Sequence, residues 1–169
     1  FIDNEDYFRR KQTYFDDNGK FFADNGERAV FFARGVLETV KKLRWAPDVI
    51  HCQGWISQVL PLYLKKAYKD DPIFSGSKVV LSLFGDTPKE SLGKDFQKTV
   101  LFGGITPDDV PLLENPDGIN LAKTAAQYSD GIILGSPDVD QGIVSLWKEL
   151  GLPVLPLDAA FPASGRCVG

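Results

Sequence analysis

Short apolar runs alternate along the chain with longer stretches in which apolar residues recur every three or four positions. The short runs are typical of strands in a parallel sheet that is covered on both faces, and the longer stretches predict amphipathic helices. The alternation indicates an α/β fold with a doubly wound, mostly parallel sheet. Strands are expected at 48–52, 78–84, 131–134 and 154–155, and helices at 24–44, 55–68, 117–128 and 138–150.

Local signals mark where several helices begin or bend. Asp24 is followed three residues later by Glu27, which has the form of a capping box with Asp in place of Ser or Thr. The segment 106–109 places Thr, Pro and two acids in the order expected for a helix start. Pro61 falls inside the helix expected at 55–68 and predicts a kink there, because proline removes one backbone hydrogen bond.

The best candidate for a functional site lies at the end of the first strand. His51, the only histidine, stands near the carboxyl end of that strand, and Gln53 and Gly54 form the turn that follows. In open α/β sheets ligands bind in the crevice at this end, beside helix N-termini. The competing interpretation is that His51 is a hydrogen-bonded core residue without a ligand. Segment 82–86 ends the next strand and is expected to border the same crevice.

Aromatic side chains are concentrated in the N-terminal loop that precedes the first long helix. They either line a groove, where sugar rings stack well on aromatic faces, or plug the loop onto the core. The residues in question are Tyr7, Phe8, Tyr14, Phe15, Phe21 and Phe22.

Composition and motifs exclude several classes of function. The net charge of −4 and the lack of a basic stripe make nucleic acid an unexpected partner. No apolar run approaches the ~20 residues of a membrane span, and no secretory signal is present, so a cytoplasmic location is expected. The GxGxxG, Walker A and GxSxG motifs are absent, and Cys52 falls on the strand face opposite His51, which disfavours a Cys–His pair.

The chain contains no Met and opens on FIDNEDYF, which leads us to expect a fragment of a longer protein. Residues 1–157 are predicted to form part of one domain. Residues 158–169 are predicted to be a tail that has little periodicity.

Several segments resemble the bacterial starch and glycogen synthases. WAPDVIHCQGW resembles the W-x-P-D-V-V-H-x-H-D-W segment of that family, and NLAKTAAQYSDGIILGSP resembles its F-L-K-A-G-L-x-Y-A-D-x-I-T-x-V-S-P segment. ADNGER (23–28) resembles its T-D-N-x-x-R positions. The resemblance implies the N-terminal, Rossmann-like half of a GT-B fold. It also implies transfer of glucose from ADP-glucose to an α-1,4-glucan, with no metal and no other cofactor.

The resemblance also shows where this chain departs from the family. Gln53 and Gly54 stand at the second His and the Asp of H-x-H-D-W, and Leu83 and Phe84 replace a His-Asn pair after the next strand. The loss of such hydrogen-bond partners at a sugar site typically costs one to several kcal/mol each, so we expect the chain alone to be inactive.

The candidate ligand-binding residues are therefore Asp24, His51, Gln53 and Gly54, with no residue assigned to catalysis or to a metal. The expected ligands are an α-1,4-glucan or ADP-glucose. Two further hypotheses remain open: a non-catalytic, glucan-binding or regulatory domain, and a protein-interaction domain that forms homo-oligomers through an exposed sheet edge.

Overall fold

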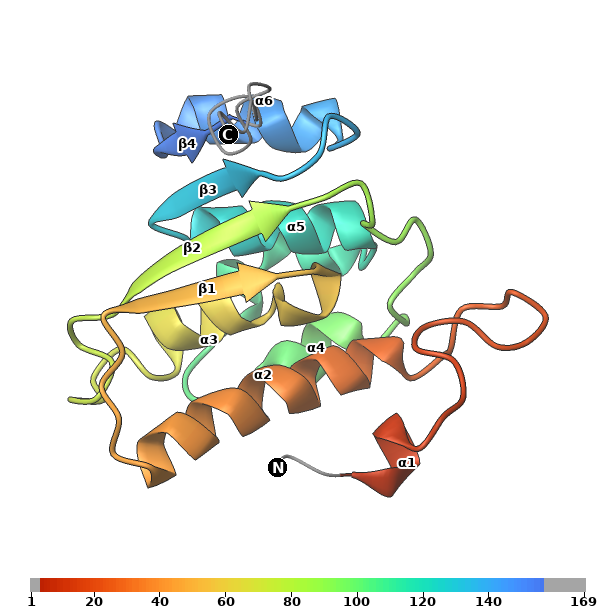
Figure 1. Ribbon diagram of the computed structural model, residues 1–169, viewed down its shortest axis with the longest axis horizontal. Helices are drawn as coiled ribbons and strands as arrows, with labels where there is room; N and C mark the ends of the chain where they lie inside the picture. Colours follow the sequence, from red (N-terminus) through yellow and green to blue (C-terminus); the bar gives the residue numbers. More distant parts are fainter. Residues whose placement is uncertain (1–3, 157–169) are drawn as a thin grey trace, which may run out of the picture.

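The computed structural model describes residues 4–156, and these form a parallel sheet with helices packed against it (Figure 1). The four strands lie side by side in the order β1-β2-β3-β4, and every neighbouring pair is parallel. The predicted α/β class is confirmed, and each strand lies within one residue of its expected position. The strands are β1 (Val49–Gln53), β2 (Lys78–Leu83), β3 (Gly131–Leu134) and β4 (Val154–Leu155). The predicted tail and the first three residues lie outside the described part.

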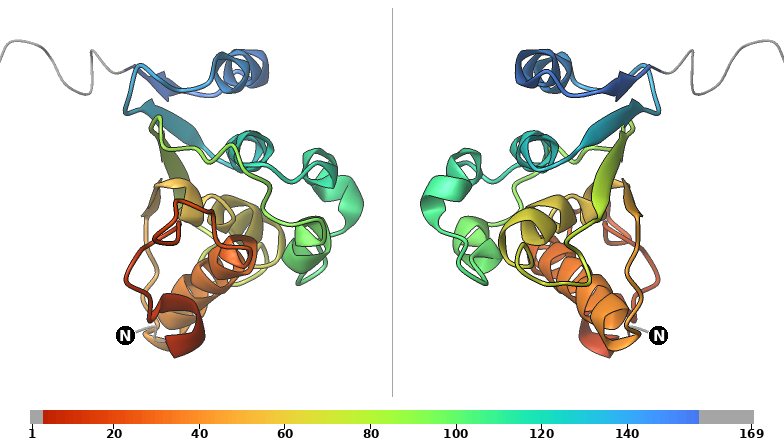
Figure 2. Two further views of the ribbon diagram at one scale, coloured as in Figure 1. Left: turned by 90° about the vertical axis from the view of Figure 1, so that its right-hand side faces the viewer. Right: turned by 90° about the vertical axis from the view of Figure 1, so that its left-hand side faces the viewer.

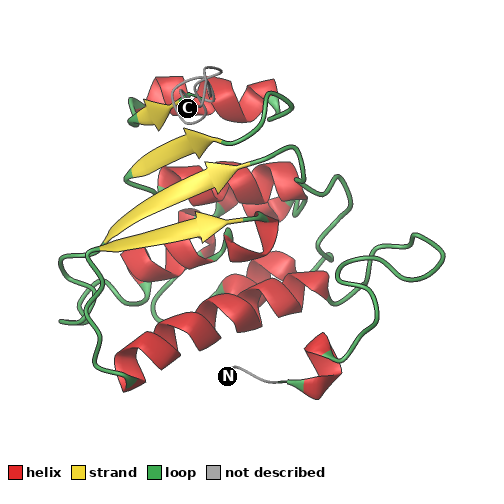
Figure 3. Cartoon of the chain, in the orientation of Figure 1, coloured by secondary structure: helices red, strands yellow, loops and turns green. Residues whose placement is uncertain are grey.

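Helices connect the strands and precede the first of them (Figure 3). The longest helix, α2, spans Asn25–Lys42 and was expected from the sequence, whereas the short helix α1 (Glu5–Phe8) was not. The other α-helices are α3 (Leu60–Lys66), α4 (Phe96–Val100), α5 (Gly118–Gln127) and α6 (Gln141–Leu150). Three 3₁₀ helices complete the set: η1 (Trp55–Ser57), η2 (Pro107–Asp109) and η3 (Pro111–Glu114).

Helices α3, α5 and α6 all lie on one face of the sheet (Figure 2). Each strand is added on the same side of the previous one, and right-handed crossovers then bring every connecting helix to the same face. The expectation that β1 is covered on both faces is therefore wrong for the described residues. Cys52 points to the helices and is buried, while Val49, His51 and Gln53 are exposed on the open face.

The core lies between the helices and the covered face of the sheet. Val79, Leu81 and Leu83 of β2 point into it and are at most 1% exposed. Helix α2 contributes a stripe of small and aliphatic residues, including Ala33 and Leu37, and packs on α3, α4 and η1. This arrangement fixes the position of the turn after β1, because η1 is held between α2 and the strand that precedes it.

The capping box predicted at Asp24 is wrong, although α2 does begin directly after this residue. The Asp24 backbone (φ −95°, ψ 9°) does not have the extended conformation usual for a capping side chain, and its carboxylate accepts no hydrogen bond from the helix. The carboxylate is instead paired with the Arg10 guanidinium, and Glu27 accepts a hydrogen bond from the Tyr7 hydroxyl.

The kink predicted at Pro61 is also wrong. The segment expected to form one helix is divided into η1 and α3, and Pro61 lies in the first turn of α3. The first backbone N–H groups of a helix have no partner within the helix, so proline is accommodated there without loss of a bond. The helix start predicted around Thr106 is confirmed, and Thr106 and Asp109 form a capping box at η2.

Candidate functional site

His51 is held by a hydrogen bond across the β1–β2 pair. Its Nε2 atom lies 2.7 Å from the Oγ atom of Ser82, on the open face of the sheet. The parallel register aligns Ser82 with Gln53, so Ser82 lies two residues further toward the carboxyl end than the position opposite His51. The serine is 3% exposed and the histidine is exposed, so the contact orients the imidazole while leaving it accessible to a ligand.

The turn after β1 depends on Gly54, as predicted from the sequence. Its φ of 74° lies in the left-handed region, which a residue with a Cβ enters only at a cost. The carbonyl oxygens of Gln53 and Gly54 both accept a hydrogen bond from the Ser57 hydroxyl, at 3.0 and 2.8 Å. A Cβ on Gly54 would lie 3.9 Å from a carboxylate oxygen of Asp86. The segments that follow β1 and β2 therefore lie close together at one edge of the sheet.

A cavity of about 370 Å³ lies beside this turn. We call it the aromatic cavity, because Tyr14, Phe15, Phe21 and Trp55 form one wall and segment 85–90 forms the other. The rings contact one another: the Tyr14 and Trp55 centroids are 5.0 Å apart, and those of Phe21 and Trp55 are 5.8 Å apart. Three of the six N-terminal aromatics line this cavity, and two of these, Tyr14 and Phe21, also pack on the buried Trp55.

Residues 14–22 form a hairpin-like loop that supplies three of these rings. Phe15 and Phe21 pair as an isolated antiparallel bridge, and the Phe22 N–H donates to the Tyr14 carbonyl at 3.0 Å. The loop is tied to α2 by Asn25, whose side-chain amide donates to the Tyr14 carbonyl at 2.9 Å. Arg28 donates to the Thr13 carbonyl at 2.7 Å, so the first turn of α2 positions the wall of the cavity.

Sequence reasoning missed Asn25 and Arg28. Both are buried, and burial lowers the pKa of the Arg28 guanidinium, which lies within 6.0 Å of the rings of Phe8, Tyr14 and Phe22. The available signal was the segment ADNGER itself, in which Asn25 and Arg28 stand at the Asn and the Arg of the family's T-D-N-x-x-R positions. An Arg in the first turn of a helix, where the helix dipole does not favour a cation, also indicates a specific tertiary contact.

The structure does not bring Asp24 together with the other three predicted residues. Its carboxylate accepts hydrogen bonds from both terminal guanidinium nitrogens of Arg10, one of them at 2.8 Å. These hydrogen bonds hold the pKa of the Asp24 carboxyl below its ordinary value. Among residues 4–156, no hydrogen bond or ion pair joins this carboxylate to His51, Gln53 or Gly54. His51, Gln53 and Gly54 do lie together, at the carboxyl end of β1.

Two departures from the family motif are explained by packing. Leu83 is 1% exposed and belongs to the core, so its side chain is not available to a ligand. Phe84 packs against Gly135 so closely that a Cβ on that glycine would lie 2.2 Å from the ring. The edge of the sheet is therefore apolar at the two positions where the family has a His-Asn pair.

A parallel α/β domain with a polar cluster and a cavity at the carboxyl end of its strands is the arrangement of a Rossmann-like, ligand-binding half-domain. Residues 1–153 match the starch synthase catalytic domain. The chain belongs to the starch synthase catalytic domain family.

Similar proteins are glycogen synthases from several bacteria. The protein from Chlorobium limicola is 37% identical over 134 residues, which cover 77% of this chain and 26% of that protein. The one from Elusimicrobium minutum is 37% identical over 140 residues (82% and 28%), and the one from Clostridium perfringens is 33% identical over 132 residues (78% and 26%). The chain thus spans about a quarter of the length of these relatives. Within the described residues, no helix is long and apolar enough to cross a membrane.

Proposed function

We propose that this chain is the acceptor-side part of a cytoplasmic glucosyltransferase that moves glucose from ADP-glucose to the end of an α-1,4-glucan. The family match over residues 1–153 is the observation that carries the proposal. The aromatic cavity supports it, because a glucan ring presents C–H faces that pack on aromatic side chains while its hydroxyls reach the polar rim. The proposed reaction uses no metal or other cofactor of the chain.

His51, Gln53 and Gly54 take the ligand-binding roles in this proposal. His51, held by Ser82, presents a ring nitrogen to a sugar hydroxyl, and the Gln53 amide offers one donor group and one acceptor. Gly54 leaves space between the turn and Asp86. Asp24 would take part only after its carboxylate is released from Arg10, so a direct sugar contact by Asp24 requires a rearrangement of the N-terminal loop.

The chain alone is proposed to be inactive. Gln53, Gly54, Leu83 and Phe84 replace polar family positions, and the structure places the last two in apolar packing. Each missing hydrogen-bond donor near the transferred sugar removes about 2.7–4 kcal/mol of transition-state stabilisation in comparable cases, which is a hundredfold or more in rate. The same observation favours a second candidate, a glucan-binding or regulatory domain without transferase activity.

The chain is also proposed to self-associate through the edge strand β1 of its sheet. Among the described residues β1 pairs only with β2, and its sequence VIHCQ contains no Lys, Pro or other device that discourages strand addition. A homo-oligomer formed through this edge would appear in light scattering as a dimer whose fraction rises with concentration. A strict monomer at all concentrations would contradict it.

The transferase proposal is tested by measuring incorporation of labelled glucose from ADP-glucose into maltoheptaose. The intact natural protein and the 169-residue chain are assayed side by side. Transfer by the intact protein and none by the chain is the expected result. Absence of transfer by the intact protein, together with retained binding of maltoheptaose, would replace the enzyme by the non-catalytic glucan-binding candidate.

A further inference from the structure

Asp86 brings a carboxylate without a protein partner to the aromatic cavity. The residue follows β2 and is one of those that line this cavity. Its side chain is exposed, and within the part of the chain that the structure describes it accepts no hydrogen bond and forms no ion pair. An ionised carboxylate accepts hydrogen bonds through both of its oxygens. Asp86 is therefore available to a ligand that donates hydrogen bonds.

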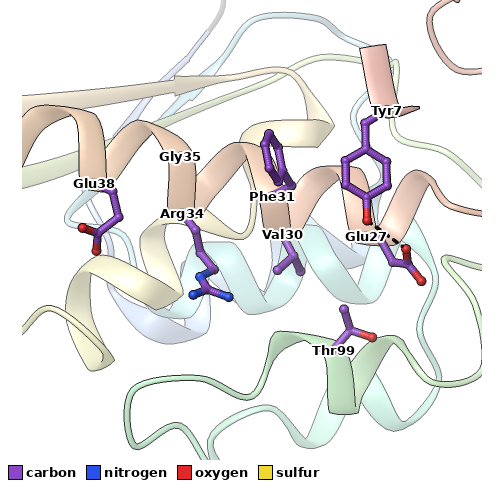
Figure 4. A pocket seen from close by; sticks show the side chains of 8 residues that line it. All are labelled: Tyr7, Glu27, Val30, Phe31, Arg34, Gly35, Glu38 and Thr99. Carbon is purple, nitrogen blue, oxygen red and sulfur yellow. Dashed lines mark hydrogen bonds between the residues drawn. The ribbon is translucent and has the colours of Figure 1, made fainter. Parts of the chain in front are cut away.

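The carboxylates of a second, larger concavity already have protein partners. This concavity has a volume of about 530 Å³ and lies along α2, where Glu27, Arg34 and Glu38 are among its lining residues (Figure 4). Glu27 accepts a hydrogen bond from the Tyr7 hydroxyl at 3.1 Å, and Glu38 accepts one from the Tyr68 hydroxyl at 2.5 Å. Asp86 differs from both, because no donor of the described chain is bonded to it.

The Asp86 carboxylate lies beside the turn that follows β1. One of its oxygens is 3.9 Å from the position that a Cβ on Gly54 would occupy, and apart from the two neighbours of Gly54 no other described residue has an atom within 4 Å of that position. Gly54 stands where the family motif H-x-H-D-W has Asp. The segment after β2 therefore supplies a carboxylate next to the place from which the motif would supply one.

Tyr14 faces the same space from the N-terminal loop. Burial raises the pKa of the Tyr14 hydroxyl, the negative charge of Asp86 raises it further, and the positive charge of Arg28 opposes the shift. The carboxylate thus lies within electrostatic reach of this hydroxyl. The Tyr14 ring also packs on the buried Trp55 ring, with centroids 5.0 Å apart. A hydroxyl and a carboxylate beside an aromatic wall suit a ligand that has apolar faces and several hydroxyl groups.

We propose that Asp86 anchors an α-1,4-glucan in the aromatic cavity, by accepting hydrogen bonds from the hydroxyls of one glucose unit in place of a carboxylate at position 54. The same glucose unit accepts a hydrogen bond from the Tyr14 hydroxyl and packs a C–H face on the neighbouring rings. The inference rests on the proposed function, because it takes a glucan as the ligand of this cavity. It adds a binding residue that lies outside the family motif.

The test is isothermal titration of the chain and its variants with maltoheptaose. Asp86→Asn is expected to raise the dissociation constant about tenfold, because a hydrogen bond to a charged acceptor becomes one to a neutral acceptor. Asp70→Asn is the matched control, since Asp70 is also exposed and has no side-chain partner among residues 4–156. The urea midpoint should be equal in Asp86→Asn and the unchanged chain, whereas a purely structural role of Asp86 would lower it.

Two further variants separate the position of the carboxylate from its charge. Glu90→Gln removes another carboxylate that lines the cavity and should leave the dissociation constant within about twofold, because exposed charges are screened by water and salt. The double variant Gly54→Asp/Asp86→Ala returns a carboxylate to the turn after β1. It should recover part of the affinity that Asp86→Ala alone loses, provided that circular dichroism shows it to be folded.

Equal affinity in Asp86→Asn and the unchanged chain would overturn the inference while leaving the glucan proposal in place. An equal loss of affinity in Asp86→Asn and Glu90→Gln would also overturn it, by showing that only the total charge of the cavity matters. If the unchanged chain binds no maltoheptaose at all, the proposed function itself is contradicted, and the assignment of Asp86 is contradicted with it.

Discussion

The Nε2 atom of His51 and the Oγ atom of Ser82 lie 2.7 Å apart, on two neighbouring strands and on the face of the sheet that the helices leave open. The hydrogen bond restricts the imidazole to one orientation at the carboxyl end of β1. The histidine singled out by sequence therefore has both a fixed geometry and access to a ligand, which a buried core histidine would not have.

Removal of the Ser82 hydroxyl tests whether this orientation is used. Ser82→Ala is expected to weaken maltoheptaose binding at the β1 edge by about three- to tenfold, the equivalent of one ordinary hydrogen bond. Ser75→Ala, in an exposed loop, is the matched control and should have no effect. Isothermal titration provides the measurement. Equal affinity in Ser82→Ala and the unchanged chain would show that the ligand does not depend on the histidine orientation.

Gly54 stands where the family motif H-x-H-D-W has Asp. The substitution Gly54→Asp restores that residue and is expected to destabilise the chain. At φ 74° and ψ 152° the backbone is in a region essentially restricted to glycine, so a non-glycine residue costs about 1–3 kcal/mol, and the new carboxylate would lie close to that of Asp86. Gly54→Ala is the control, because it carries the same backbone cost without a carboxylate beside Asp86. Urea unfolding should show a larger loss of free energy for Gly54→Asp. Equal losses would mean that the crowding around Asp86 has no energetic effect.

Stability should fall in acid partly through Asp109. Its hydrogen bond with Lys66, followed by that with the Thr106 backbone, lowers the pKa of this carboxyl from 3.8 to about 2. Because the folded-state pKa lies below the unfolded value, the contribution is fully present above pH 4 and is lost as the pH falls toward 2. Urea midpoints measured between pH 6 and 2 should therefore decline less steeply in Asp109→Asn. A decline of unchanged slope would contradict the assignment.

Cys52 is expected to be unreactive while the chain is folded. The residue is 2% exposed, and burial raises the pKa of its thiol to about 12, so almost no thiolate exists at neutral pH. In a Cys167→Ser variant, where Cys52 is the only cysteine, reaction with a thiol reagent at pH 8 should occur only at the rate of unfolding. Rapid modification without denaturant would show that the covered face of β1 is open.

The sheet was largely predictable because its strands are short apolar runs bounded by Gly, Pro and Asp. The exposure of β1 was not recognised, although polar side chains at His51 and Gln53 alternate with Ile50 and Cys52 in the period of a half-covered strand. Considered as one continuous apolar run, the segment predicts a strand that is covered on both faces. The side of the sheet on which the helices would lie depends on strand order, which no local pattern specifies.

The sequence predicts the candidate site only for residues that are neighbours along the chain. His51, Gln53 and Gly54 are close in sequence and were found together. The local pattern predicts Asp24 as a helix cap, whereas its hydrogen-bond partner in the structure, Arg10, lies fourteen residues away. The aromatic cavity depends on the docking of the N-terminal loop by Asn25 and Arg28, which is a tertiary contact that periodicity does not encode.

The most direct test of the account is a titration of the chain with maltoheptaose and, separately, with ADP-glucose, followed by backbone amide shifts around the aromatic cavity. The account predicts saturable shifts at Gln53, Gly54 and Trp55 and in segments 14–22 and 85–90 with the glucan. If these amides do not respond to either compound, the carboxyl end of β1 is not a glucan site, and the central claim is contradicted.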